Sequence, residues 1–528
     1  MQTRFDTMEK RLLLGDEAVA LGAVNAGLSG VYAYPGTPST EITEFIQRVA
    51  PQIRSRWCTN EKTAMEAALG MSFAGKRALV CMKHVGMNVC ADAFVNSAIT
   101  GVNGGLVVLA ADDPSMHSSQ NEQDSRFYGK FAMVPVFEPS CQQEAYDMVS
   151  EAFILSERLH LPVLFRVVTR LAHSRAAVSV GEVLPQNALN PASDRGWVLL
   201  PAIARKQYDA LIAKQPEIQK YNGSVSAIEC QPGVAKVKLG VIACGIGYNY
   251  VKEAAADVAI LKINRYPLPE DAVKALSLRC EKILVVEDGQ PVVEQDVKAI
   301  LGAGYNVRGR LTGDLPRTGE LTPDTVAAAL GKRPAEGAGK AEALAPRPPQ
   351  LCPGCGHRDV YAALGKVVSE YPGAKVFGDI GCYTLGALPP FAALASCVDM
   401  GASITMAKGA ADAGVFPAVA VIGDSTFTHS GMTGLLDAVN DRSNITVVIS
   451  DNLTTAMTGG QDSAGTSKFE GICTALGVEP EHVRTVVPLP QNMEEITRVI
   501  REEIEYEGVS VIIPRRECMQ TLKRHLKK

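Results

Sequence analysis

The sequence predicts an α/β protein built on doubly wound parallel sheets. Short apolar runs rich in Val, Ile and Ala have the length of fully buried strands. Segments of helical length separate these runs, and the alternation restarts after residues 237 and 350. A chain of 528 residues has room for about three domains. We therefore expect three α/β units along the chain.

The first unit is assigned to residues 1–189. Helices are expected at 39–50 and 63–75, each between two strands. The expected strands are the apolar runs 30–34, 77–82, 104–110 and 161–168. In such a sheet the loops at the carboxyl ends of the strands lie along one edge, and open α/β sheets bind ligands there.

The remainder divides into four parts. Residues 190–237 have weak periodicity and are expected to form a connector with some helix and no clear strand. The second unit is assigned to 238–331. Residues 332–350 are rich in Ala, Gly and Pro and are expected to form a linker. The third unit, 351–528, should contain strands at 374–381, 417–424, 444–452 and 509–514.

Composition narrows the functional classes. A formal net charge of −5 gives no basic excess, so nucleic acid is not an expected partner. No apolar run reaches the length of a membrane span, and the N-terminal segment lacks the apolar core of a signal peptide. A cytoplasmic protein is therefore expected. Its 13 cysteines should then be reduced rather than paired in disulfides.

Two polar residues end neighbouring strands of the third unit. Asp424 follows one expected strand and Asn452 the next, so a right-handed crossover places both at one sheet edge. With the carbonyl of Thr454, they offer the oxygen ligands that Mg²⁺ prefers, and Mg²⁺ commonly also binds phosphate oxygens. Gly423 allows close backbone approach, and the helix start after Ser425 faces an anion. An Asp after a strand is more often a simple helix cap.

The spacing of these residues resembles the thiamine diphosphate motif, with Ser425 where the third position is usually Gly. Thiamine enzymes also need a carboxylic acid beside the pyrimidine, which promotes the proton transfer that activates the cofactor. Glu61, at the start of the helix-like segment 59–75, fits this role better than Glu66. The plainer alternative is a Glu that only complements the helix dipole.

Seven sequence blocks resemble the 2-oxoacid:ferredoxin oxidoreductase family, and in particular its indolepyruvate:ferredoxin oxidoreductase large (alpha) subunits. They are YPGTPSTEI, NEKTAMEAA, MKHVGMNVCAD, ADDPSMHSSQNEQDSRFY, CPGCGH, GDIGCYTLG and DNLTTAMTGGQ. The resemblance implies two thiamine diphosphate-binding domains, with a transketolase C-terminal-like domain at 238–331. It also implies decarboxylation of an aryl 2-oxoacid, two one-electron oxidation steps and acyl transfer to coenzyme A.

The same resemblance implies roles for residues of the first unit. Thr37 matches a position that touches the substrate carboxylate. Arg126, with Lys130 as the alternative, is expected to be its basic partner. His84 and Lys83 lie on a strand-end loop that faces the substrate, although a lone His is more often structural. In the third unit, Met457 is compatible with an aromatic substrate.

Four cysteines match the family's cluster positions: Cys352, Cys355, Cys382 and Cys518. Four thiolates suit either a [4Fe–4S] cluster or a structural zinc, and spacing does not separate the two metals. A cluster is favoured because oxidation needs a nearby electron acceptor and no flavin or nicotinamide fingerprint is visible. His357 is then expected to be a structural neighbour. A thioredoxin-like switch is disfavoured, because the first pair follows a Pro-rich segment.

The sequence has no ferredoxin-like run of the kind that usually follows in these large subunits. Electrons are therefore expected to leave for ferredoxin or a ferredoxin-like subunit. A small beta subunit is expected to bind most of the coenzyme A and shield the cluster, in an (αβ)₂ assembly. The main rival is a non-oxidative thiamine decarboxylase or carboligase with a four-cysteine zinc. A non-catalytic scaffold is disfavoured, because Glu61 and Asp424 are both present.

Overall fold

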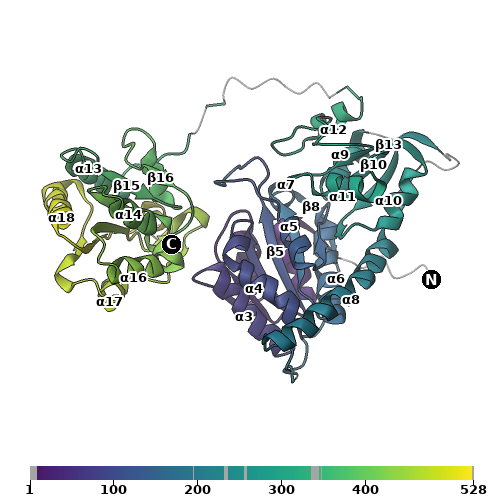
Figure 1. Cartoon of the computed structure of the whole chain (residues 1–528), viewed down its shortest axis with the longest axis horizontal. Coiled ribbons are helices and arrows are strands. Elements are labelled where there is room, and N and C mark those ends of the chain that lie inside the picture. The colour runs from purple at the N-terminus through teal and green to yellow at the C-terminus, as the bar shows by residue number, and fades with distance from the viewer. Residues whose placement is uncertain are drawn as a thin grey trace. The chain divides into compact units, whose positions relative to one another are not determined.

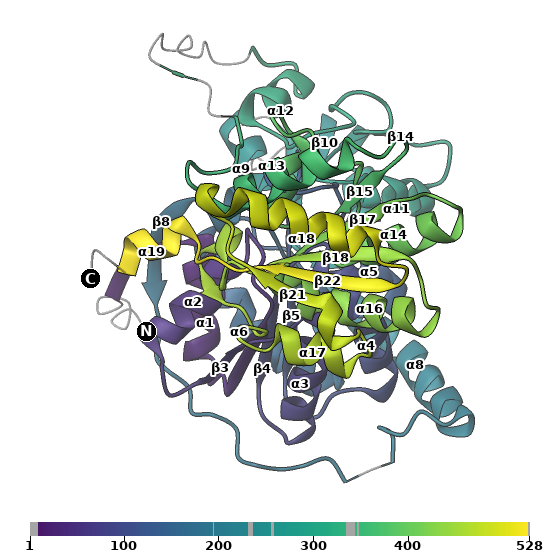
Figure 2. The same cartoon turned by 90° about the vertical axis from the view of Figure 1, so that its left-hand side faces the viewer.

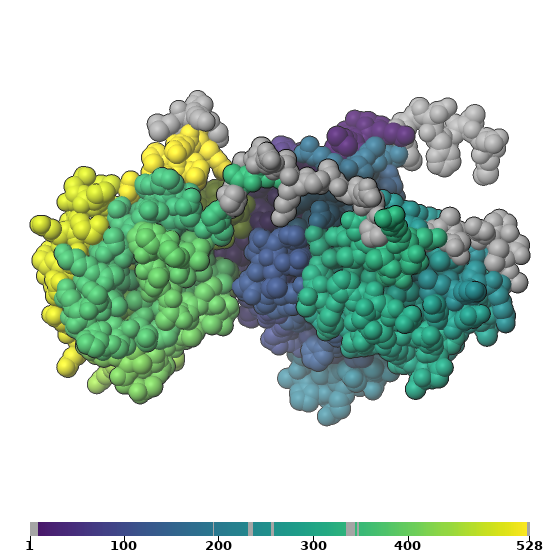
Figure 3. All heavy atoms as spheres, turned by 90° about the horizontal axis from the view of Figure 1, so that it is seen from above, coloured from purple at the N-terminus to yellow at the C-terminus, as the bar shows by residue number. Residues whose placement is uncertain are grey.

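The computed structural model describes residues 9–193, 195–230, 236–254, 258–333, 344–345 and 348–525. The chain divides into two compact units, unit 1 (Met1–Ala338) and unit 2 (Gly339–Lys528). Parallel sheets flanked by helices form both units, which confirms the predicted α/β class (Figure 1). The spheres of unit 2 run from green to yellow in Figure 3. Most of the linker expected at 332–350 lies outside the described residues.

The larger sheet of unit 1 has seven strands. Its order is β12 (Arg265–Tyr266), β6 (Val136–Phe137), β7 (Val163–Val168), β5 (Leu106–Asp112), β4 (Ala78–Lys83), β2 (Gly30–Ala33) and β3 (Arg54–Trp57). Only β12 pairs antiparallel. All residues of β5 and β7 are buried, which explains their continuous apolar runs. Since β12 comes from the second expected unit, the first two units share this sheet.

The helices of unit 1 alternate with its strands. They are α1 (Gly15–Asn25), α2 (Thr40–Val49), α3 (Glu61–Phe73), α4 (Gly86–Thr100), α5 (Arg126–Ala132), α6 (Gln142–Leu159), α7 (Thr169–Ala172), α8 (Pro201–Val225), α9 (Gly247–Ala254), α10 (Glu270–Ser277), α11 (Val292–Leu301) and α12 (Pro323–Ala329). Strand β1 (Glu9–Leu14) precedes α1, and β8 (Arg175–Val180) follows α7. The two strands pair antiparallel as a separate ribbon.

The second sheet of unit 1 has five strands. Their order is β14 (Asn306–Arg308), β13 (Cys280–Val286), β10 (Val237–Cys244), β11 (Ala259–Ile263) and β9 (Ile228–Glu229). The expected connector 190–237 contains the 25-residue helix α8 and, against expectation, the short edge strand β9. The periodicity of α8 is weak because only Leu211, Ile218 and Asn222 along it are buried.

Unit 2 has one six-stranded parallel sheet. Its order is β16 (Ser396–Cys397), β15 (Lys375–Gly378), β17 (Ala418–Gly423), β18 (Ile445–Ser450), β22 (Val509–Pro514) and β21 (Val483–Val486). Its helices are α13 (Gly356–Val368), α14 (Ala402–Asp412), α15 (Asp424–Thr426), α16 (Met432–Asn440), α17 (Phe469–Ala475), α18 (Met493–Glu505) and α19 (Met519–His525). Figure 2 shows α18 running beside β22. Among the described residues, no helix is long and apolar enough to cross a bilayer.

Candidate functional site

Asp424 and Asn452 lie at one edge of the unit 2 sheet, as the sequence predicts. They follow β17 and β18, which are neighbouring parallel strands paired up to Gly423 and Ser450. Asp424 Oδ2 and Asn452 Oδ1 each accept a hydrogen bond from the backbone N–H of Thr454, both at 3.1 Å. The Asp424 carboxylate and the Asn452 amide oxygen therefore lie close together, because both contact the same N–H group of Thr454.

Asp424 is buried, and burial together with nearby Asp451 raises its pKa to about 7. Its other carboxylate oxygen accepts the backbone N–H of Ser425 at 2.7 Å. A buried carboxylate beside an amide oxygen is costly to ionise, and a divalent cation at this point would offset that cost. The two side chains therefore fit the oxygen ligands of a magnesium ion.

The turn after β17 explains why residue 423 is Gly. A Cβ there would lie 2.6 Å from the ring of Tyr383, whose hydroxyl donates to the buried carboxylate of Asp379. The helix starts at Asp424 itself as α15, one residue before the position expected from the sequence. The hydroxyl of Ser425 meets that of Thr455 at 3.0 Å, so the third motif residue ties α15 to the next loop.

The four cysteines of the expected cluster line one cavity of unit 2. The cavity has a volume of about 160 Å³, and His357 and Asn452 are also in its wall. Burial, with a smaller contribution from the other three cysteines, raises the pKa of the Cys382 thiol to about 12. No three of the four sulfurs lie within 4.8 Å of one another. The four thiols thus line the same cavity, but no three of their sulfur atoms meet at one point.

Cys518 reaches this cavity because its segment is fastened beside β18. Its backbone N–H donates to the carbonyl of Asn452 at 3.1 Å, and Arg516 N donates to the carbonyl of Asp451 at 3.0 Å. The buried Asp451 carboxylate accepts from Arg515 Nε at 2.6 Å. Arg515 also pairs with Glu470 at 2.7 Å. Asp451 therefore holds the segment of Cys518 in place, and it is not one of the proposed magnesium ligands.

His357 connects the cysteine cavity to the Asn452 side chain. It is buried, and burial lowers its pKa to about 4, so the ring is neutral at neutral pH. Its Nε2 accepts from the Asn452 amide nitrogen at 3.5 Å. That contact leaves the amide oxygen directed at Thr454. The geometry agrees with the structural place expected for this histidine.

Three expected residues of unit 1 lie at the carboxyl ends of neighbouring strands. Thr37 is in the loop after β2, Glu61 begins the helix after β3, and His84 follows β4 directly. The strand order β4, β2, β3 places these ends side by side on the sheet edge. A Cβ at Gly36 would be 3.1 Å from the Lys83 side chain, so the loop carrying Thr37 packs against the end of β4.

Glu61 is buried, although it occupies the first turn of a helix. The helix is already capped by Asn60, whose side chain accepts from Thr63 N at 2.9 Å. The Glu61 carboxyl group instead packs against the start of α4, where a Cβ at Gly86 would lie 2.6 to 2.9 Å from it. Gly86 was not predicted from the sequence as a site residue, and its only signal there is its place in the block MKHVGMNVCAD.

His84 is fully enclosed, with one ring nitrogen 3.2 Å from Asn121 Oδ1. The other nitrogen, Nδ1, is buried and has no hydrogen-bond partner among the described residues. Lys83 donates to the carbonyl of Ser118 at 2.9 Å, and burial lowers its pKa. His84 therefore keeps an unused polar atom at this edge, while Lys83 is engaged by the chain.

Arg126 does not occupy the position expected for a residue that binds a substrate carboxylate. Its side chain is 1 % exposed and forms ion pairs with Asp124 at 2.6 Å and Glu287 at 3.0 Å. Its remaining N–H groups meet the Tyr266 hydroxyl and backbone carbonyls. All five donors of the guanidinium are thereby used inside the protein. We correct the expectation, and Arg126 instead joins the two sheets of unit 1.

Lys130, the alternative for that role, is 55 % exposed and pairs with Asp296. A second buried arginine, Arg166, extends the Arg126 network by pairing with Asp112 at 2.6 Å and with Glu138. Both basic residues suggested as the partner of Thr37, Arg126 and Lys130, are thus paired with carboxylates of the protein, and that partner is not assigned in unit 1.

Two family models of thiamine diphosphate-binding domains match this chain, one in unit 1 and one in unit 2. Residues 21–199 match the family model "Pyruvate flavodoxin/ferredoxin oxidoreductase, thiamine diP-bdg". Residues 379–513 match "Thiamine pyrophosphate enzyme, C-terminal TPP binding domain". A solved 2-oxoglutarate:ferredoxin oxidoreductase from Magnetococcus marinus covers 61 % of this chain and 65 % of its own, with a TM-score of 0.52 and 16 % identity. That likeness shows the fold.

Curated relatives extend the match to nearly the whole chain. Indolepyruvate oxidoreductase subunit IorA of Archaeoglobus fulgidus is 39 % identical over 97 % of this chain and 86 % of its own length. The subunits of the same name from Pyrococcus abyssi and Methanothermobacter thermautotrophicus are 39 % and 37 % identical over the same share of this chain. The chain therefore belongs to the indolepyruvate oxidoreductase IorA family of 2-oxoacid:ferredoxin oxidoreductases.

Proposed function

We propose that this chain is the catalytic subunit for oxidative decarboxylation of an aryl 2-oxoacid such as indolepyruvate, with electrons passing through a [4Fe–4S] cluster to ferredoxin. One observation carries the proposal. Asn452 faces Asp424 through their shared contact with Thr454 N, and it also lines the cavity of the four cysteines. A cofactor held at Asp424 would therefore lie close to an electron acceptor held by the thiols.

Asp424, Asn452 and the Thr454 carbonyl would hold Mg²⁺ and, through it, the diphosphate of thiamine diphosphate. Thiamine diphosphate, when bound, supplies the nucleophilic carbon and the electron sink for loss of CO₂. Glu61 would donate a hydrogen bond to the pyrimidine ring, since it is buried and not needed as the helix cap. Thr37 would bind the substrate carboxylate, and His84 would face the substrate through Nδ1.

The spacing of the thiols supports iron–sulfur over zinc. Four thiolates around one zinc at about 2.3 Å would lie only about 3.8 Å from one another. In the structure no three of the four sulfurs fall within 4.8 Å of one another, so the thiols do not form the tight group that a zinc ion needs. A [4Fe–4S] cluster binds each thiolate to a different iron and so needs the wider spacing. Zinc binding would favour the non-oxidative decarboxylase alternative.

Coenzyme A would be the acyl acceptor, bound mainly by a small beta subunit, with ferredoxin or a ferredoxin-like subunit as the electron acceptor. The relatives are named as subunits, which supports a partner chain. An (αβ)₂ assembly in the cytoplasm completes the proposal. Met457, 60 % exposed on unit 2, would contact the aromatic part of the substrate.

The test is anaerobic purification with the beta subunit, followed by metal analysis and turnover of a 2-oxoacid panel with a viologen acceptor. We expect about four irons per chain and highest kcat/KM for aryl 2-oxoacids. Glu61→Gln should abolish turnover, whereas Glu66→Gln on the exposed side of the same helix should not. Zinc without iron, or full turnover by Glu61→Gln, would contradict the proposal.

A further inference from the structure

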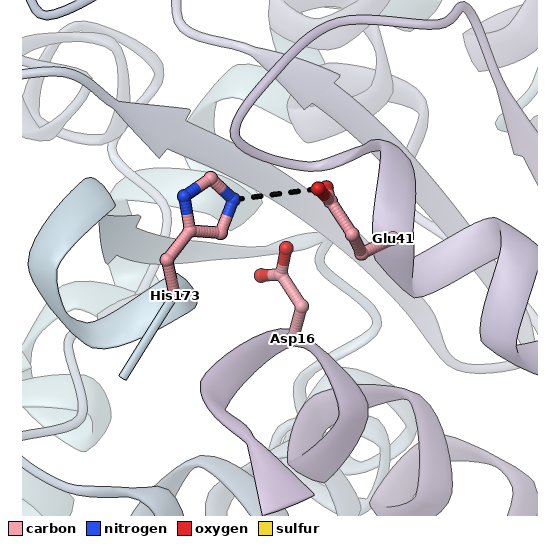
Figure 4. A group of neighbouring side chains, drawn as sticks. All are labelled: Asp16, Glu41 and His173. Carbon is pink, nitrogen blue, oxygen red and sulfur yellow. Dashed lines mark ion pairs between the residues drawn. The ribbon is translucent and has the colours of Figure 1, made fainter. Parts of the chain in front are cut away.

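Three potential metal ligands from separate parts of unit 1 meet in a group that shares no member with the residues assigned to the thiamine site. Asp16 lies in the first turn of α1, Glu41 in the first turn of α2, and His173 directly after α7. One ligand atom from each lies within 4.8 Å of the other two. Figure 4 shows the Asp16 carboxylate directed into the space between the other two side chains.

Asp16 is the unusual member of this group. It is 0 % exposed, and neither carboxylate oxygen has a hydrogen-bond partner among the described residues. An Asp in the first helical turn normally accepts a free backbone N–H. Here Glu17 does this instead, accepting Leu14 N at 3.0 Å. The helix therefore does not explain why a carboxylate is buried at this position.

A proton alone does not satisfy Asp16. Burial and the charges of Glu41 and Glu17 raise its pKa well above the ordinary value. The protonated group would still need an acceptor for its O–H, and neither oxygen has a partner. Glu41 adds a third buried, unpartnered oxygen, Oε2, while its Oε1 lies 3.5 Å from His173 Nε2. The cluster thus has three unpartnered carboxylate oxygens, and its one basic group, His173, contacts only the remaining oxygen of Glu41 among these ligands.

We propose that Asp16, Glu41 and His173 bind a divalent first-row metal ion of the zinc type. Two carboxylates balance the charge of one such ion, so binding removes the cost of the buried Asp16 charge. The imidazole ligand favours Zn²⁺ over Mg²⁺ and Ca²⁺, which prefer oxygen. Three protein ligands leave a fourth position for water.

The site would hold together the starts of α1 and α2 and the end of α7. The first turn of α2 is also tied to the loop that carries Thr37. Gly36 N donates to Thr40 Oγ1 at 3.0 Å, and Ser39 Oγ donates to the Gly36 carbonyl at 2.8 Å. A metal at Glu41 would therefore stabilise this loop through the first turn of α2, without being a reactant.

The test is equilibrium dialysis of the full chain with ZnCl₂ under reducing conditions and saturating Mg²⁺, which occupies oxygen-only sites. Wild type should retain one more equivalent of zinc than His173→Gln and than Glu41→Gln. The altered side chains are 37 % and 38 % exposed, so both variants should fold. His117→Gln is the matched control, because His117 pairs with Glu320 at 3.3 Å in the same way but outside the cluster.

We also expect Zn²⁺ to raise the Tm of wild type and of His117→Gln, and not the Tm of His173→Gln. The proposal is overturned if all four proteins bind equal zinc. It is equally overturned if Mg²⁺ competes fully for the extra equivalent, since an imidazole site should resist that competition.

Discussion

The contact between Gly86 and Glu61 allows a sharp test of how the proposed activating acid is positioned. Replacing Gly86 with Ala adds one methyl group at the start of α4. That carbon would lie 2.6 Å from Glu61 Cγ and 2.7 Å from its Oε1. The backbone at Gly86 is not in the left-handed region, so the helix itself accepts Ala. The side chain that must move is therefore Glu61.

The size of the effect follows from this geometry. To regain an ordinary contact, the Glu61 carboxyl group has to retreat by about 1 Å. A misplacement of that size costs about 10²-fold in rate, which corresponds to about 2.7 kcal/mol of activation free energy. We therefore expect Gly86→Ala to lower kcat by about one to two orders of magnitude. The loss should be incomplete, because the Glu61 carboxyl group is displaced and not removed.

The assay is anaerobic, viologen-coupled turnover of an aryl 2-oxoacid by the assembled enzyme, with iron content measured in parallel. Gly70→Ala is the control, because it lies in the Glu61 helix and a Cβ there meets nothing within 4 Å. It should keep full turnover and gain up to about 1 kcal/mol of stability. Unchanged kcat in Gly86→Ala would refute the positioning argument, as would an equal loss in both variants.

Three further predictions concern the cysteine cavity, the buried arginine and an acid-sensitive ion pair. Cys382→Ser should lose the iron–sulfur absorbance and most of the iron, whereas Cys397→Ser, at an exposed cysteine outside the cavity, should keep both. Arg126→Met should lower the free energy of unfolding in urea by about 3–5 kcal/mol, because it leaves buried carboxylates unpaired, while Lys130→Met on the surface should change it by no more than about 0.5 kcal/mol. Arg515 lowers the pKa of Glu470 to about 2, so the stabilisation from this ion pair is present above pH 4.5 and is lost as the pH falls towards 2. Glu470→Gln should therefore reduce the dependence of the unfolding free energy on pH over that range. An unchanged pH dependence would count against the pairing.

Local pattern was enough to predict the parts of the fold that depend on buried strands. The runs at 417–424 and 444–452 have no charged residue before Asp424 and Asp451, so their strand ends were identifiable. Parallel pairing then places the two ends together, as observed. Helix α8 was harder to delimit, because most of its surface faces water and it lacks a strong apolar stripe.

Contacts between distant segments were beyond the reach of the sequence. Resemblance to the family suggested a substrate role for Arg126, but its partners include Glu287, which directly follows β13 of the other sheet of unit 1. No local pattern links the two residues. The same holds for the cluster of Asp16, Glu41 and His173, which lie in α1, in α2 and directly after α7 and only meet once the chain is folded. Gly86 needed the side chain of Glu61 in place before its role was visible.

The fastening of Cys518 beside Asn452 has a consequence for biogenesis. Three thiols leave the ribosome early, but the fourth follows Cys382 by 136 residues, which takes about 7 to 27 s at about 5–20 residues per second. Its segment docks only after β18 has formed, since it hydrogen-bonds to the backbone just beyond that strand. During that interval the cavity is open on one side. Loading of the proposed cluster would therefore be a late maturation step, and cells would have to protect three unliganded thiols from oxidation until then.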